Sequence, residues 1–246
     1  MSTATEAERA PDPSPQPHQG VREHLPELLA LSANSPFWQG RDSGLASART
    51  PVFQAFPRTG LPRHFASWED YVEAVDVLVR CNAIPEPTFL WWDARLQPRL
   101  GTLEVRIMDA QSRVEDTAAL AALVQCLVQR EAVAGGRGEA PTPPEVLEEN
   151  RFLAARDGMA AELVDPAAGR CVAVADRLED LVAACAPYAG GLGCARELAF
   201  AARLAEAPGA ARQRVLGQGP EGLAGVLRAL AREFASGRPE PAPQPV

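Results

Sequence analysis

The stretch LWWDARLQPRLGTLEVRIMD, residues 90–109, says most about how this chain folds. In its second half, polar and apolar residues alternate strictly, a pattern that predicts a half-buried β-strand. The polar face of this strand carries Glu104 and Arg106, and Asp93 and Arg95 occupy a similar arrangement just upstream. An acid and arginines that project from one sheet face could hold a metal–nucleotide phosphate.

Two interpretations of Glu104 and Arg106 stay open on residue types alone. The pair could be an ion pair on a solvated strand, which contributes little. It could also be a phosphate site, because arginines stabilise charge on a transferring phosphoryl group and carboxylates hold Mg²⁺ beside phosphate oxygens. Arg95, and Arg49 in an aromatic-rich segment, favour the second interpretation, since several arginines near one face suit a polyanion.

Composition excludes several classes of function. The chain has 246 residues, 46% of them hydrophobic, and a net charge of −8, which argues against nucleic acid as a main partner. No apolar run is long enough for a membrane span, and the first residues lack the pattern of a secretory signal. The five cysteines form no CxxC pair, so we expect buried thiols in a reducing cytoplasm.

Every basic side chain other than histidine is arginine, because the chain contains no lysine. A Schiff-base lysine or a Walker-type lysine is therefore impossible, and any phosphate or carboxylate must be bound by arginine, backbone amides or metal. None of the three histidines has the spacing of a metal site. The segment 217–222 matches G-x-G-x-x-G but lies between predicted helices, so it indicates a helix end followed by a new helix start.

The chain divides into one folded region flanked by tails. Residues 1–20 and 237–246 are rich in Pro and are expected to be disordered. Between them we expect a sheet and active-site part at 21–134, a flexible connection, and a helical part at 144–236. Residues 34–63 are expected to form an ordered, functional loop because they carry four aromatic side chains.

Ser67 and Asp70 indicate a helix start, and a hairpin is expected over 163–174. Helices are expected over 21–33, 67–79, 114–133, 145–156, 177–186, 195–205 and 221–234.

Several segments in order resemble the glutamate–cysteine ligase type 2 family, the bacterial carboxylate–amine ligases. They are SANSPFWQGRDSGLASAR (32–49), GLPRHFASWEDY (60–71), the stretch 90–109, ENRFLAARDGMAAELVDP (149–166) and GAARQR (209–214). The resemblance implies an α+β fold like that of glutamine synthetase, with a curved, mostly antiparallel sheet and packed helices. It also implies ATP-dependent joining of glutamate to an amino compound such as cysteine, as in glutathione-like thiol biosynthesis.

Carried over by motif, the resemblance gives roles to four residues of this sequence. Glu104 would be a Mg²⁺ ligand, and Arg106 would contact the transferring phosphoryl group. Arg95 would bind ATP phosphates, and Arg49 would bind the substrate carboxylate or phosphate. ATP and Mg²⁺ are therefore the expected cofactors, and the reaction would depend on positioning and electrostatics.

The sequence departs from the family pattern at its start. The Gly-x-Glu-x-Glu strand and the HVHVG strand of the family are not found here, so the resemblance covers roughly the C-terminal two-thirds of a full member. A single carboxylate is a poor Mg²⁺ site, so we expect weak or no ligase activity from this chain alone. The alternative is a non-catalytic partner protein that pairs, through an open sheet edge, with a separate N-terminal half or a paralogue.

Overall fold

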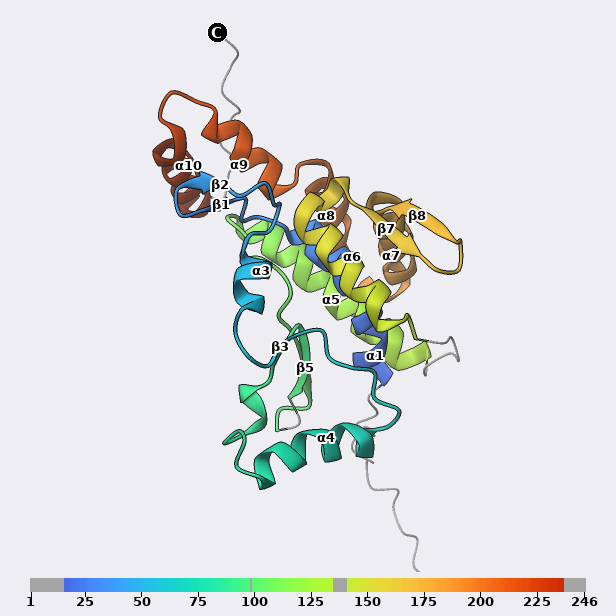
Figure 1. The fold of residues 1–246 in the computed structure, drawn as a ribbon. Coiled ribbons are helices and arrows are strands. Elements are labelled where there is room, and N and C mark those ends of the chain that lie inside the picture. Colours follow the sequence, from blue (N-terminus) through green and yellow to red (C-terminus); the bar gives the residue numbers. More distant parts are fainter. Residues whose placement is uncertain (1–15, 98, 135–140, 237–246) are drawn as a thin grey trace, which may run out of the picture.

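The computed structural model describes residues 16–97, 99–134 and 141–236. Helices dominate a mixed helix and strand structure (Figure 1), in agreement with the expected α+β class. The longest helix, α5 (Val114–Ala134), runs through the middle of the molecule with other helices packed around it. Those other helices are α1 (Gln16–Glu23), α2 (Leu25–Ser32), α3 (Arg49–Gln54), α4 (Trp68–Arg80), α6 (Pro144–Asp157), α7 (Val174–Ala189), α8 (Ala195–Glu206), α9 (Gly209–Gly217) and α10 (Gly222–Ser236).

The main hydrophobic core lies between α5 and the helices around it. Helix α5 packs against α1, α7 and α8, and α2 packs against α6. The apolar composition of α5 explains this central position, because Ala119, Leu123 and Leu127 are all fully buried. No helix in the described part of the chain is long and apolar enough to cross a membrane.

A second, smaller core lies under α4 at the opposite end of the molecule from α9 and α10 (Figure 1). The start of α4 is capped as the sequence predicts, because the Ser67 hydroxyl accepts a hydrogen bond from the Asp70 amide at 3.2 Å. The Asp70 carboxylate accepts from the Ala66 amide in return. Tyr71 then packs edge-on against Phe65, with ring centroids 5.1 Å apart.

The strands form four separate two-stranded sheets in the described residues. The single curved sheet expected from the resemblance is therefore not formed by these residues. One of the four, β3 with β4, is parallel, and the other three are antiparallel. The strands are β1 (Phe37–Trp38), β2 (Arg41–Asp42), β3 (Thr59–Gly60), β4 (Trp91–Trp92), β5 (Ala94–Gln97), β6 (Thr102–Val105), β7 (Glu162–Asp165) and β8 (Arg170–Ala173).

The elements expected from local signals are largely confirmed. The hairpin β7–β8 occupies the predicted segment 163–174, and the predicted helix break at 217–222 separates α9 from α10. The loop 34–63 is ordered, but it also contains α3 and three short strands. Two of the five free cysteines are exposed, Cys81 and Cys171, so the expectation of buried thiols holds for three.

The expected tails and connection fall partly outside the described residues. Helix α1 begins at Gln16, inside the stretch 1–20 that we expected to be a disordered tail. The expectations for residues 1–15, 135–140 and 237–246 concern segments that the structure does not describe.

Candidate functional site

The β5–β6 hairpin brings together three of the four predicted site residues. Its register places Arg95 directly opposite Glu104. The Arg95 Nη2 donates to Glu104 Oε2 at 2.5 Å, and the Gln97 amide donates to the same oxygen at 2.8 Å. The Arg106 Nη2 donates to the other oxygen, Oε1. Glu104 therefore bridges the two arginines that the sequence predicts to bind phosphate.

The local sequence explains why the hairpin forms. Its strands are joined by a tight turn in which the Leu100 amide donates to the Gln97 carbonyl. Gly101 follows with φ of +62°, a backbone conformation that glycine adopts without strain. The predicted strand ends early, at Val105, because the amides of Arg106 and Ile107 both donate to the carbonyl of Asp93.

Two arginines share one carboxylate, so the cluster carries a net positive charge. Partial burial raises the pKa of Glu104, but the hydrogen bonds from Gln97 and Arg95 and the charges of Arg95 and Arg106 outweigh it. The net result is a pKa below the ordinary value, so Glu104 is ionised at neutral pH. The remaining positive charge is suited to an anion such as a phosphate.

The donor capacity of the two arginines differs. Arg95 is nearly buried, and its Nη1 also donates to the carbonyls of Thr88 and Leu90. Arg106 is more exposed, and within the described part of the chain its side chain donates to Glu104 alone. The Nε atoms of both arginines are buried and have no hydrogen-bond partner among the residues that the structure describes. Unsatisfied buried donors are costly, so both positions fit a ligand that accepts hydrogen bonds.

The same residues do not by themselves fit a magnesium ion. Both oxygens of Glu104 already accept hydrogen bonds from arginine or glutamine. The described residues contain no cluster of three or more His, Cys, Asp or Glu side chains that could hold a metal. Mg²⁺ needs about six oxygens, so Glu104 could supply only one part of such a site.

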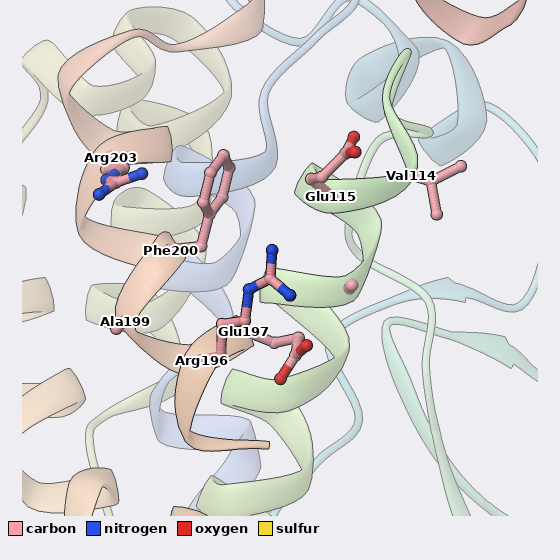
Figure 2. Close-up of a pocket in the computed structure, with 8 residues that line it drawn as sticks. Val114, Glu115, Arg196, Glu197, Ala199, Phe200 and Arg203 are labelled. Carbon is pink, nitrogen blue, oxygen red and sulfur yellow. The ribbon is translucent and has the colours of Figure 1, made fainter. Parts of the chain in front are cut away.

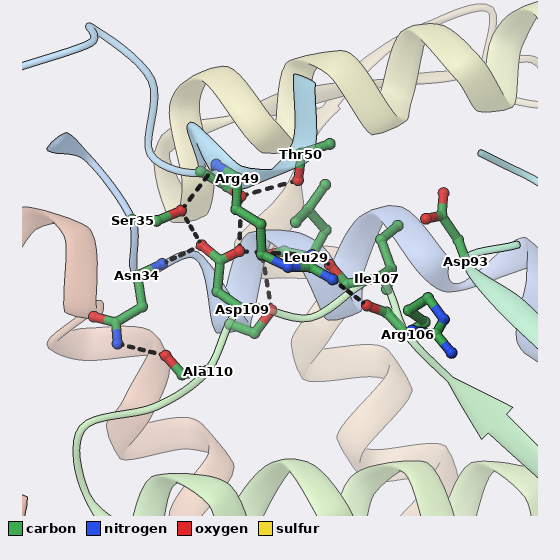
Figure 3. Close-up of polar contacts among 12 residues, drawn as sticks. Leu29, Asn34, Ser35, Arg49, Thr50, Asp93, Arg106, Ile107, Asp109 and Ala110 are labelled. Carbon is green, nitrogen blue, oxygen red and sulfur yellow. Dashed lines mark hydrogen bonds and ion pairs between the residues drawn. The ribbon is translucent and has the colours of Figure 1, made fainter. Parts of the chain in front are cut away.

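Arg49 lies at the start of α3 and contacts the chain just beyond β6 (Figure 3). Its two terminal nitrogens donate to the main-chain carbonyls of Arg106 and Ile107 at 2.8 and 3.0 Å. Its Nη1 also lies 3.8 Å from Asp109. The structure therefore brings Arg49 to Arg106 through the backbone, and not to the guanidinium groups of the hairpin cluster.

Asp93 does not share the environment of Arg95, which is a correction to the expected pairing. Asp93 lies in the bend between β4 and β5, where alternation is lost, and its side chain is buried. Its carboxylate accepts from Arg151 Nε at 2.6 Å, whereas Arg95 turns to Glu104. Burial raises the pKa of Asp93, and the charge of Arg151 opposes that shift.

Two important residues were missed by reasoning from the sequence. Asp109 joins the loop after α2 to the end of the 90–109 stretch, and Arg151 of α6 is the partner of Asp93. Asp109 ends the predicted strand, and serine and threonine residues lie near Arg49 in the sequence. These hydroxyl groups are a weak signal that a buried carboxylate accepts their hydrogen bonds. No local signal connects Asp93 with Arg151, which is 58 residues away.

A groove of the described residues lies elsewhere. It has a volume of about 510 Å³ and lies between the start of α5 and α8 (Figure 2). Arg196, Glu197 and Arg203 line it, together with Phe200. None of the four predicted site residues lines this groove, so size alone does not identify the site, and the charged hairpin is the better candidate.

Comparison with known proteins identifies relatives over most of the chain. The model of glutamate-cysteine ligase family 2 (GCS2) matches residues 10–233. A Rubrobacter xylanophilus protein named "Putative glutamate--cysteine ligase 2-3" is 46% identical over 213 residues, which cover 86% of this chain and 57% of that protein. Similarly named proteins of Micrococcus luteus and Gloeobacter violaceus are 42% and 38% identical, over 79% and 88% of this chain and 50% and 59% of their own lengths.

The chain thus spans about half the length of the curated relatives that it matches. The family model nevertheless covers nearly all of the residues that the structure describes, including the β5–β6 hairpin and α6. This chain belongs to glutamate–cysteine ligase family 2.

Proposed function

We propose that this chain carries the phosphate-binding part of an ATP-dependent carboxylate–amine ligase. The observation that carries the proposal is the cluster on the β5–β6 hairpin, in which Glu104 bridges Arg95 and Arg106 and neither arginine Nε has a partner among the described residues. Family membership supports the same chemistry, because the names of the relatives describe glutamate–cysteine ligases.

The proposed reaction has two steps. The γ-carboxylate of glutamate attacks the terminal phosphorus of ATP, which releases ADP and forms γ-glutamyl phosphate. An amine such as that of cysteine then attacks the acyl carbon, loses a proton and displaces inorganic phosphate, which leaves an amide. In this proposal Arg106 stabilises charge on the transferring phosphoryl group, and Arg95 holds the phosphates of ATP.

Arg49 has a supporting place in this proposal. It holds the carbonyls of Arg106 and Ile107, so it orients the chain that carries the phosphoryl-binding arginine. About a third of its side chain is exposed, which leaves one side accessible to a substrate carboxylate or phosphate. We propose that orientation is its main role and that substrate contact is secondary.

Glu104 would supply one ligand of Mg²⁺. Because a single carboxylate whose oxygens are already hydrogen-bonded is a poor magnesium site, we propose that further oxygens come from the part of the longer relatives that this chain does not match. We therefore expect nucleotide binding by this chain, with weak ligase turnover.

The test separates binding from turnover. ATP binding is measured by calorimetry with and without Mg²⁺, and turnover is measured as ADP release with glutamate and cysteine. Arg106→Gln should weaken nucleotide binding by about tenfold, because a hydrogen bond to a charged group contributes about 1.5–3 kcal/mol. Arg170→Gln, on the exposed hairpin β7–β8, is the matched control and should leave binding unchanged. Absence of ATP binding, or equal binding by both variants, would contradict the phosphate site, and normal turnover would contradict the need for further magnesium ligands.

A second function is favoured by the edge of β6. In the described residues β6 pairs only with β5, so its other edge offers unpaired backbone groups to a further strand. The chain could then act as a non-catalytic partner of a separate N-terminal half or a paralogue. Light scattering of the chain alone, and of the chain mixed with the N-terminal half of a relative, tests this. A chain that stays monomeric in both samples would exclude it.

A further inference from the structure

A small pocket lies between α3 and α6, beside the candidate site but separate from the hairpin cluster. Its volume is about 130 Å³. Apolar side chains form most of its wall, and these are Leu45, Pro51, Phe152 and Ala155. An apolar cavity of about 150 Å³ accommodates a molecule the size of benzene, so this pocket suits a ligand of about five or six heavy atoms.

Arg151 is the cation that lines the pocket, and its charge is already compensated. Its Nε donates to Asp93 at 2.6 Å, and its Nη1 donates to the Gln54 side-chain oxygen at 3.0 Å. Only 3% of the residue is exposed. Because the buried Asp93 carboxylate balances the guanidinium, Arg151 does not make the pocket a binding site for an anion.

The uncompensated charge of the pocket is the carboxylate of Glu148. Glu148 lies one turn before Phe152 on α6 and lines the exposed part of the pocket. It forms no ion pair with any residue that the structure describes. The other nearby cation, Arg22, is paired with Glu23 at 2.8 Å. Partial burial raises the pKa of Glu148 and the Asp93 carboxylate adds to this shift, whereas the charges of Arg151 and Arg22 and a hydrogen bond from the Leu61 backbone amide oppose it.

We propose that the pocket between α3 and α6 binds a small primary amine in its ammonium form, with the ammonium group at Glu148 and an apolar body of about four or five carbons between Pro51 and Phe152. The ligand lacks a carboxylate, because no uncompensated cation in the pocket would receive one. The ligand class is defined by the pairing of its ammonium group with the Glu148 carboxylate and by the packing of its carbons against the apolar wall of the pocket.

The pocket is connected to the candidate site through Asp93. The Asp93 side chain holds Arg151, and its main-chain carbonyl accepts from the Arg106 amide at 2.7 Å. Thr50, which lines the pocket, follows Arg49 in α3. An amine in this pocket would therefore lie close to the arginines that we assign to phosphate. The binding of an amine in this pocket does not depend on the proposed ligase function.

The test uses three probes with four carbons each: isobutylamine, isobutyrate and isobutanol. Each is titrated into the full chain without ATP, and binding is followed by NMR chemical shifts and calorimetry. We expect saturable binding of isobutylamine and much weaker binding of the other two. Glu148→Gln should weaken amine binding by about tenfold, because it removes a charge-assisted hydrogen bond. Glu149→Gln, on the same helix but outside the pocket, is the matched control and should leave the affinity unchanged.

The results of the probe titrations and of the two glutamate variants each support or overturn the proposed amine site. Preferential binding of isobutyrate would overturn the proposal, because Arg151 would then be the recognition group. Equal affinities of the two glutamate variants, or no saturable binding of the amine, would also overturn it. Amine binding in a chain that binds no ATP would preserve the pocket and refute the proposed ligase function, so the two failures can be told apart.

Discussion

Asp109 offers the strongest test of how the candidate site is held together (Figure 3). Its buried carboxylate accepts hydrogen bonds from the Asn34 amide at 2.9 Å, the Ser35 hydroxyl at 2.7 Å and the Ser47 hydroxyl at 2.9 Å. It also lies 3.8 Å from Arg49. Replacement of Asp109 by Ala would remove the acceptor that joins both ends of the 34–49 loop to the chain after β6.

The contacts set the size of the expected loss. Each of the three hydrogen bonds to the charged carboxylate contributes about 1.5 kcal/mol at the lower limit of the usual range. The ion pair with the partly exposed Arg49 adds less than about 1 kcal/mol after solvent screening. The Ser47 hydroxyl can still bond to Thr50, which reduces the total. Asp109→Ala should therefore lower the free energy of unfolding by about 3–4 kcal/mol, and Asp109→Asn by about half as much.

Urea unfolding followed by circular dichroism measures this loss, and hydrogen exchange of the Asn34 amide reports local release of the loop. Asp180→Ala, on the exposed face of α7, is the control and should change stability by less than about 0.5 kcal/mol. A loss below about 1 kcal/mol for Asp109→Ala, with unchanged exchange at Asn34, would refute the reasoning.

Three further predictions concern pH, charge and backbone strain. Burial lowers the pKa of His18 to about 4. The unfolded chain binds the proton at about pH 6.5, so His18 should lower the free energy of unfolding by about 2 kcal/mol between pH 7 and 5, and urea titrations should show that His18→Gln removes this part of the loss, while His24, whose pKa burial also lowers, still contributes. Glu104→Gln frees the charge of two arginines, so calorimetry should show metal-free ATP bound a few-fold more tightly, with any benefit of Mg²⁺ lost. Gly158 has φ of +57°, and an added Cβ would lie 3.0 Å from the Ala46 Cβ, so Gly158→Ala should cost about 1–3 kcal/mol in thermal unfolding, whereas Gly191→Ala should cost little.

Local signals predict local structure in this chain. The start of α4 follows from Ser67 because its hydroxyl caps an amide three residues away, and the β7–β8 turn follows from Asp165 and Gly169 in the same way. The sheets depend on distant partners. The parallel contact of Thr59 with Trp91 joins segments that no periodicity connects. The single curved sheet was expected from the family resemblance alone, and the described residues form four short pairs instead.

In the candidate site, too, the sequence predicts contacts between residues that are close in the chain and misses contacts with distant partners. The sequence predicts that Glu104 and Arg106 lie near each other, and the structure pairs them although β6 ends at Val105. The position of Arg95 opposite Glu104 comes from the register of β5 with β6, which alternation does not give. Alternation fails for Asp93, because the chain bends there and the nearest cation comes from α6.

A guanidinium has five N–H donors, and how they are used separates the four arginines near the candidate site. Arg49 donates to two carbonyls, Arg151 to a carboxylate and an amide, and Arg95 to two carbonyls and Glu104. Each of these three holds other parts of the fold in place. Arg106 donates to Glu104 through Nη2 and is more exposed than Arg95, so N–H groups at the end of its side chain are available to a ligand. Among the four, Arg106 is therefore the arginine best placed to contact a phosphoryl group, and Arg49 and Arg95 fix its position through the main chain and through Glu104.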